Sequence, residues 1–215
     1  MKNSFYTSIE KYGNDILWRG YENGKPFARK VKYEPTFYLP NRKGDSDKYS
    51  LGTEIPLAEK KFPNMKEAKE FVDQYKDVHG MRVYGNSNFI AQFTYDKYPD
   101  VIKYDMQKIH IFMFDIEVDI STGFPDMQKA DKPITSIALK SSKRSEYVLL
   151  GLKDYDKHKT ETGISPDNIR FHKFDDEIAL LSYFIKIWKN DYPDIITGWN
   201  VEFFDVQYII TRISR

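Results

Sequence analysis

The pattern of hydrophobic and polar positions divides the chain into two halves of different character. In the first half, short alternating segments at residues 4–9, 15–21 and 27–33 are typical of β-strands. The pair Asn23-Gly24 lies between the second and third segments and predicts a hairpin turn, because both residues tolerate positive φ. This half is therefore predicted to be β-rich.

One helix is expected to follow these strands. Asn64 is a suitable N-cap with Glu67 three residues later, and Gly80 is a candidate C-terminal stop. The apolar positions between them recur with the helical period: Met65, Ala68, Phe71, Val72 and Tyr75. Residues 89–98 are ambiguous between a short helix and a loop.

The second half begins with a long apolar run at residues 108–118, which predicts a strand buried on both faces. Residues 134–140 and 146–152 read as two further strands. A polar turn at 141–144 joins them, so we expect an antiparallel meander.

A helix capped by Asp175 or Asp176, a short buried strand at 194–199 and a last helix after residue 205 complete the pattern. The helical stripes are Ile178, Leu181, Phe184, Ile185 and Trp188, and then Val206, Ile209, Ile210 and Ile213. We predict an α/β (α+β) fold with a mixed sheet, and two domains at residues 1–105 and 106–215.

Composition narrows the functional classes. Lys and Arg (33) nearly balance Asp and Glu (32) for a net charge of +1, which disfavours a polybasic nucleic-acid binder. The absence of cysteine excludes a disulfide scaffold, a thiolate zinc site and a cysteine nucleophile. No apolar run approaches the roughly 20 residues of a membrane span, so no membrane partner is expected.

Two carboxylates are the first candidate for chemistry. Asp115 and Glu117 lie at positions i and i+2 of a predicted strand, so their side chains project from one face. Their mutual repulsion in an apolar setting favours a divalent cation such as Mg²⁺ or Mn²⁺. The alternative is that both are ordinary strand-end acids facing solvent.

Asp205 is the second candidate. A short strand leads through a turn into a helix that starts at this residue, which would place its carboxylate at a strand edge, able to face Asp115. An acid at a helix start is also a routine capping residue. Taken alone, Asp205 would be assigned to capping.

The segment that contains Asp115 and the segment that contains Asp205 are together a more specific signal than either is alone. Phe-Asp-Ile-Glu at 114–117, Thr-Gly-Trp-Asn at 197–200 and Phe-Phe-Asp at 203–205 resemble the first two exonuclease motifs of family B DNA polymerases. The similarity is greatest to the polymerases of T-even-type bacteriophages. It extends over the whole chain, more loosely in residues 1–100.

The resemblance implies a β-rich polymerase N-terminal domain followed by an incomplete ribonuclease-H-like 3′–5′ exonuclease domain. By motif position, Asp115, Glu117 and Asp205 would be catalytic and would hold two Mg²⁺ or Mn²⁺ ions. Asn200, Phe204 and Phe124 would lie near the bound strand. The expected partner is DNA, as a single-stranded 3′ end or a primer-template, and RNA is a further candidate partner. The expected location is the cytoplasm, which would be the cytoplasm of a bacterial host if a phage encodes the chain.

The chain also departs from the family pattern. A third motif, Tyr-x-x-x-Asp, and the polymerase palm motifs do not follow Asp205. We therefore expect an excised piece or one subunit of a split polymerase, which is inactive or very weak alone. The remaining polymerase segment or a partner chain would complete the site.

Two alternatives remain open at this stage. The chain could be a non-catalytic module that binds nucleic acid and docks a partner chain. It could also be a ribonuclease-H-like nuclease complete in itself. The latter needs a local fourth acid, with Asp119, Asp126 and Asp131 as candidates.

Overall fold

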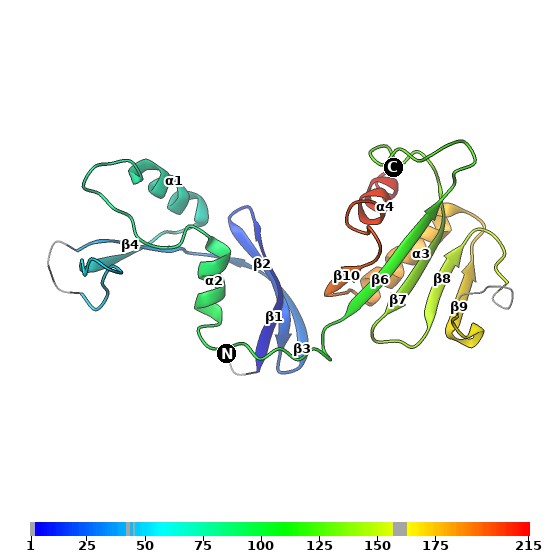
Figure 1. The fold of residues 1–215 in the computed structure, drawn as a ribbon, viewed down its shortest axis with the longest axis horizontal. Coiled ribbons are helices and arrows are strands. Elements are labelled where there is room, and N and C mark those ends of the chain that lie inside the picture. Colours follow the sequence, from blue (N-terminus) through cyan, green and yellow to red (C-terminus); the bar gives the residue numbers. More distant parts are fainter. Residues whose placement is uncertain (1–2, 42–43, 45, 157–162) are drawn as a thin grey trace. The chain divides into compact units, whose positions relative to one another are not determined.

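The chain forms two compact units, Met1–Asp105 and Met106–Arg215, each with its own hydrophobic core (Figure 1). The computed structural model describes residues 3–41, 44, 46–156 and 163–215. β-strands dominate the first unit, and the second combines a sheet with two helices. This mixed α/β architecture confirms the predicted fold class.

The first unit is built on an antiparallel sheet with the strand order β1-β2-β3. The strands are β1 (Ser4–Tyr12), β2 (Asp15–Glu22) and β3 (Lys25–Lys32). Asn23 (φ 52°) and Gly24 (φ 75°) turn the chain between β2 and β3, which confirms the predicted hairpin. A second antiparallel pair joins β4 (Thr36–Pro40) to β5 (Leu57–Lys61).

Helix α1 (Met65–Tyr75) starts at the predicted cap. The Asn64 Oδ1 accepts a hydrogen bond of 2.9 Å from the Glu67 amide, and the Asn64 side-chain amide donates to Glu67 Oε1. The helix ends at its C-cap Lys76, so the prediction that Gly80 stops it was wrong. The chain has already left the helix when Gly80 adopts its positive φ of 78°.

The ambiguous segment after residue 88 is helix α2 (Phe89–Lys97), capped by the side chain of Asn88. Its Phe93 is buried against Trp18, with ring centroids 5.5 Å apart. The Trp18 indole also donates a hydrogen bond of 3.2 Å to the Tyr98 hydroxyl. Aromatic packing between the sheet and α2 thus holds this unit together.

The second unit contains a five-stranded mixed sheet with the order β10-β6-β7-β8-β9. The strands are β6 (Ile111–Val118), β7 (Ile134–Ser141), β8 (Tyr147–Gly151), β9 (Ile169–Lys173) and β10 (Ile195–Thr197), with a 3₁₀ turn (Pro166–Asn168) before β9. β6, β7 and β8 pair antiparallel, which confirms the predicted meander. The outer strands β10 and β9 run parallel to their neighbours, β6 and β8.

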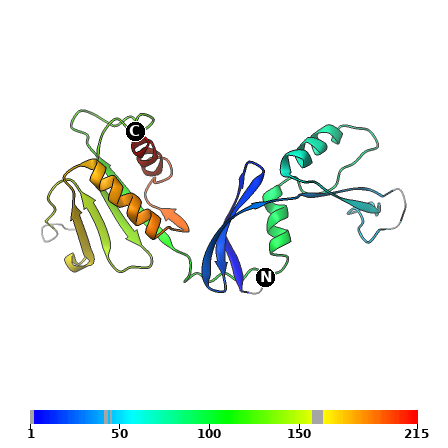
Figure 2. The same ribbon diagram turned by 180° about the vertical axis from the view of Figure 1, so that it is seen from behind.

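Two helices pack on one face of this sheet: α3 (Glu177–Asn190) and α4 (Asp205–Ile213). Figures 1 and 2, taken from opposite sides, show α3 behind the sheet in one view and in front of it in the other. Phe114 of β6, Phe184 of α3 and Ile209 of α4 belong to one buried cluster. On the opposite face of β6, Met113, Asp115 and Glu117 are exposed.

Burial on one face corrects the prediction for β6. Phe112, Phe114 and Ile116 are buried, whereas the alternating Met113, Asp115 and Glu117 are exposed. The prediction of burial on both faces was wrong because helices cover only one side. The two acids of this strand therefore project from its open face.

Two further details differ from the prediction. β10 is an edge strand of three exposed residues, not a buried strand, because only β6 flanks it. In α3, Ile178 is 77% exposed while Leu180 is fully buried, so the buried stripe is rotated from the expected one. Asp176 is the N-cap, its Oδ1 accepting from the Ala179 amide.

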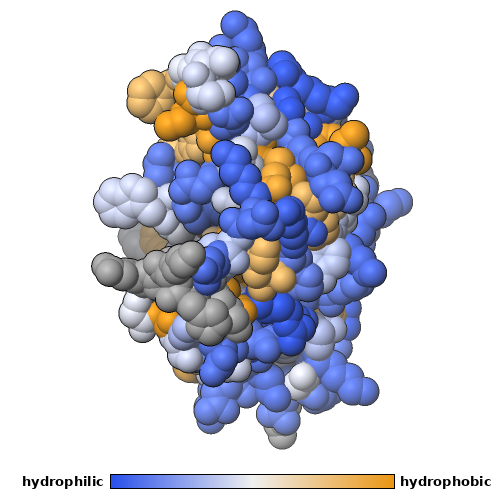
Figure 3. Space-filling model, turned by 90° about the vertical axis from the view of Figure 1, so that its right-hand side faces the viewer, coloured by the Kyte–Doolittle hydropathy of each residue, from blue (hydrophilic) through white to orange (hydrophobic). Residues whose placement is uncertain are grey.

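The surface is mostly hydrophilic where Figure 3 presents it, with hydrophobic side chains in small separate patches. Among the residues that the structure describes, no helix has the length and apolar character needed to cross a membrane.

Candidate active site

Strand β6 carries the first two candidate acids on the open face of the sheet. Asp115 and Glu117 are both exposed, and Ile116 between them points into the core. β7 pairs with this segment, Asp115 opposite Ala138 and Glu117 opposite Ser136. The small side chains opposite the acids leave space above the strand.

Asp205 lies beside the same strand, although it is far from that strand in sequence. It is the first residue of α4 and only 3% exposed. Its Oδ1 accepts a hydrogen bond of 2.9 Å from the backbone amide of Ile116, 89 residues away in sequence. The carboxylate is therefore fixed beside the β6 backbone between the positions of Asp115 and Glu117.

The chain between β10 and α4 makes this approach possible. A Cβ added at Gly198 would lie 2.5 Å from the Phe114 carbonyl oxygen, so only glycine fits against β6 here. Asn200 then adopts a positive φ of 55°, and its carbonyl accepts from the amides of Phe203 and Phe204. This turn delivers Asp205 to the start of α4.

The pKa of Asp205 is shifted by its surroundings. Burial raises the pKa of the Asp205 carboxyl, the hydrogen bond from Ile116 opposes that rise, and the charge of Asp115 adds to it. The two acids are thus close enough to interact, although they come from distant segments. A cation between them would relieve both the repulsion and the loss of hydration.

The donor set fits a hard divalent cation in its chemistry, since carboxylate oxygens are the ligands that Mg²⁺ and Mn²⁺ prefer. Within the described residues, however, no three acidic or histidine side chains converge as a metal-binding group. The structure brings Asp115 and Asp205 together and places Glu117 on the same strand face. The ligand roles of all three stay a prediction.

The three loop acids considered as a fourth ligand each accept backbone hydrogen bonds within their own loop. Asp119 accepts from the Ser121 amide, Asp126 from the Gln128 and Lys129 amides, and Asp131 from the Asp126 amide. These hydrogen bonds lower the pKa of all three carboxyl groups. Each acid is engaged in shaping the loop after β6.

The three residues expected near a bound strand have different settings. Phe204 packs on Tyr208 with ring centroids 5.4 Å apart, and Asn200 supports the turn before it. Phe124 lies in the loop after β6 and is 93% exposed. The Phe124 ring is therefore exposed to solvent, whereas Phe204 packs on α4 and its amide donates to the Asn200 carbonyl.

Sequence analysis missed a depression of about 340 Å³ next to Asp115 on the open face. Its lining includes Met113, Lys140, Tyr147 and Trp199. Lys140 and Tyr147 lie on either side of the predicted turn of the meander, but the sequence did not predict that they pair. Met113 follows from the alternation that places Asp115.

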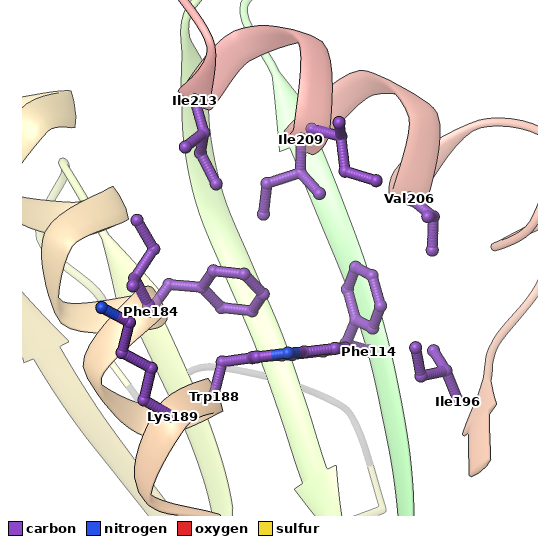
Figure 4. A pocket seen from close by; sticks show the side chains of 10 residues that line it. Phe114, Phe184, Trp188, Lys189, Ile196, Val206, Ile209 and Ile213 are labelled. Carbon is purple, nitrogen blue, oxygen red and sulfur yellow. The ribbon is translucent and has the colours of Figure 1, made fainter. Parts of the chain in front are cut away.

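A second cavity, of about 350 Å³, lies behind β6 between α3, α4 and β10. Figure 4 shows Phe114, Phe184, Trp188 and Ile209 directed into it. Among the described residues that line it, Lys189 is the one ionisable side chain, so this apolar cavity is separate from the acids on the other face.

Comparisons with known proteins show the family of the chain. The family model for the exonuclease domain of DNA polymerase family B matches residues 64–215. The DNA-directed DNA polymerases of Escherichia phage RB69 and Enterobacteria phage T4 are 30% and 33% identical over 98% of this chain. A DNA polymerase of Archaeoglobus fulgidus is 26% identical over 59% of it.

The chain spans about a quarter of the length of the two phage relatives, 25% in each case. The family match covers both exonuclease motifs read from the sequence and confirms the resemblance on which they were recognised. On this ground the chain belongs to the family B DNA polymerases, and it contains their exonuclease region.

Proposed function

We propose that the chain is the N-terminal portion of a replicative DNA-directed DNA polymerase and carries part of its 3′–5′ proofreading exonuclease site. The observation that supports this most is the buried Asp205, whose hydrogen bond to Ile116 brings it to the strand that holds Asp115. By this proposal, residues 1–105 are the polymerase N-terminal domain and residues 106–215 the partial exonuclease domain.

Asp115, Glu117 and Asp205 would hold the Mg²⁺ or Mn²⁺ ions of the site. When bound, such ions supply an activated water and stabilise the leaving 3′-oxygen. The protein contributes the placement of its carboxylates. Asp205 is held rigidly by a backbone amide, and Asp115 and Glu117 stand on a hydrogen-bonded strand.

The proposed substrate is the single-stranded 3′ end of DNA, delivered from a primer-template. Stacking on aromatic rings and contacts to phosphate hold single strands. The exposed ring of Phe124 is available for such stacking, and Asn200 and Phe204 shape the turn beside Asp205. The rest of the polymerase, or a partner chain, would supply the third motif and the palm. The proposed location is the host cytoplasm.

The test uses the full chain, a 5′-labelled single strand and Mn²⁺. We expect slow shortening from the 3′ end that disappears in Asp115→Ala and persists in the control Asp175→Ala, whose acid is exposed near α3. Mn²⁺ should also raise the melting temperature, and Asp115→Ala should remove that shift. Cleavage that survives in Asp115→Ala, or a melting temperature that does not respond to Mn²⁺, would refute the proposal.

One observation favours a second candidate, a non-catalytic subunit that binds nucleic acid and docks a partner. No three potential metal ligands converge among the described residues. Under this alternative, DNA or RNA should stabilise the fold equally well after Asp115, Glu117 and Asp205 are all changed to alanine. The same triple variant separates the two candidates, because the exonuclease proposal predicts loss of the metal response.

A further inference from the structure

Helix α4 holds a second segment of the chain besides the strand that Asp205 contacts. Tyr208 lies on the same helix face as Asp205, three residues later, and is fully buried. Its hydroxyl donates a hydrogen bond of 2.8 Å to the Lys132 carbonyl oxygen and accepts one of 3.0 Å from the Lys132 amide. A single side chain of α4 thus binds both backbone polar groups of a residue in the β6–β7 loop, residues 119–133.

The side chain of Lys132 extends this contact into the first half of the loop. Its ammonium group donates a hydrogen bond to the hydroxyl of Thr122, ten residues earlier. Thr122 is two residues before Phe124, whose ring is 93% exposed. Figures 1 and 2 both show the loop after β6 passing beside α4. A continuous path of hydrogen bonds therefore runs from Tyr208 to the neighbourhood of the Phe124 ring.

A second anchor fixes the end of the loop where β7 begins. Arg212 of α4 donates a hydrogen bond of 3.1 Å to the Ala130 carbonyl oxygen. Glu177 of α3 accepts two hydrogen bonds from Arg212 and one from the Ile134 amide. This end of the loop is therefore held by both helices, and Lys132 connects the earlier part of the loop to it.

The same loop begins directly after the candidate acids of β6. Glu117 is the last but one residue of that strand, and the Asp119 amide closes the base of the loop with a hydrogen bond of 3.0 Å to the Pro133 carbonyl oxygen. Asp205 and Tyr208 belong to one helix, so a loop fixed to Tyr208 is also fixed relative to Asp205. A loop that moved on α4 would move relative to the acids.

We infer that Tyr208 is a positioning residue, which holds the β6–β7 loop on α4 through Lys132 and so keeps the Phe124 ring in place to contact a single DNA strand. Tyr208 itself is buried and touches neither the strand nor the metal ions. Asp205 is held separately by the Ile116 amide, so the Tyr208 hydroxyl acts on strand affinity and not on metal binding. The inference rests on the proposed function and adds to it a residue that acts from inside the domain.

The first experiment measures hydrogen exchange in the full chain without ligand. Tyr208→Phe keeps the ring that packs on Phe204 and removes only the hydroxyl. Tyr183→Phe, whose ring packs on Phe174, is the matched control. We expect the amides of residues 119–132 to exchange about tenfold faster in Tyr208→Phe, because hydrogen bonds of the loop are lost, and at the original rate in the control. Equal exchange in the two variants would overturn the inference.

The second experiment measures binding of a short, 5′-labelled oligodeoxythymidylate with a phosphorothioate at its last linkage, by fluorescence anisotropy in Mg²⁺. Tyr208→Phe should weaken binding about fivefold or more, since stacking of one base on an aromatic ring contributes at least that factor. Phe124→Leu should weaken it to a similar extent. The double variant should bind no more weakly than Phe124→Leu alone, because the hydroxyl acts through that ring. Losses that add in the double variant, or unchanged affinity in Tyr208→Phe, contradict a positioning role.

The path is also tested from its exposed end, where a substitution leaves the core intact. Thr122→Val removes the hydroxyl that the Lys132 ammonium group binds, and Thr122→Ser keeps it. We expect the valine variant to bind the strand more weakly and the serine variant to bind normally. Normal binding by both variants excludes the path through Lys132, even if Tyr208→Phe fails to fold.

Failure of this inference and failure of the proposed function give different results. Mn²⁺ should raise the melting temperature of Tyr208→Phe as much as that of the unsubstituted chain. Mn²⁺-dependent cleavage with normal strand affinity in Tyr208→Phe rejects the positioning role and leaves the exonuclease proposal standing. Strand affinity that depends on Tyr208, in a chain without any response to metal, rejects the exonuclease proposal instead.

Discussion

Replacing Asp205 by asparagine should make the metal-free protein more stable at neutral pH. Burial, and then the charge of Asp115, raise the pKa of Asp205 in the folded state. The folded protein therefore holds this proton more tightly than the unfolded chain does. The Asp205 carboxyl contributes its full stabilisation at pH values below its pKa in the unfolded chain. This stabilisation is lost as the pH rises through the higher pKa of the folded state.

The size of the gain follows from the same shift. Each unit by which the folded pKa exceeds the unfolded one costs the ionised protein about 1.4 kcal/mol. Asparagine removes this cost and keeps a carbonyl oxygen to accept the hydrogen bond from Ile116. Asp205→Ala removes the acceptor as well, and a buried unpaired amide costs about 1–3 kcal/mol. We therefore expect Asp205→Ala to be less stable than Asp205→Asn by about that amount.

Urea unfolding in EDTA at pH 7 and at pH 3 measures both differences. The advantage of Asp205→Asn over the unsubstituted chain should be present at pH 7 and should shrink toward pH 3. The reasoning is refuted if Asp205→Asn is the less stable protein at pH 7, or if its advantage is the same at both pH values.

Three other substitutions test the supports of the site and fold by urea unfolding. Gly198→Ala should destabilise by about 1–3 kcal/mol, because its Cβ would meet the Phe114 oxygen at 2.5 Å and force β10 from β6. Arg212→Leu should cost roughly 3 kcal/mol, because it strands the largely buried Glu177, now paired at 2.6 Å. Asn64→Ala should cost about 1 kcal/mol through the loss of the α1 cap.

Two of these, at Gly198 and Arg212, have a matched control. Gly80→Ala meets open space and should cost only the strain of its positive φ, about 1 kcal/mol. Lys129→Ala breaks an exposed ion pair with Asp126 and should change stability by under about 1 kcal/mol. Equal losses at Gly198 and Gly80, or at Arg212 and Lys129, would contradict the structural explanation.

Local chemistry made several elements predictable. The Asn64 cap and the Asn23-Gly24 turn depend on only two or three neighbouring residues, so the local sequence was enough to predict both. Strand alternation was equally local, and it correctly placed Asp115 and Glu117 on one face. The end of α1 was not predicted correctly, since the helix ends at Tyr75 and the exposed residues 76–79 separate it from the expected stop.

The other features that were predicted wrongly depend on packing between segments that are far apart in sequence. Whether β6 is covered on one face or two depends on where α3 and α4 pack. The exposure of Ile178 has the same origin, since the sheet selects which stripe of α3 is buried. The hydrogen bond from Ile116 to Asp205 joins residues 89 positions apart. The strand–turn–helix pattern before Asp205 and the family motifs indicated that these segments meet, whereas hydrophobic periodicity alone did not.

That long separation has a consequence for synthesis. Contacts between remote segments form late, because the chain must first close a large loop. Strand β6 leaves the ribosome long before α4 exists, so the nascent chain displays two acids without their third companion. In the proposed function these three acids hold the metal ions together, so their part of the site cannot form until α4 has been synthesised.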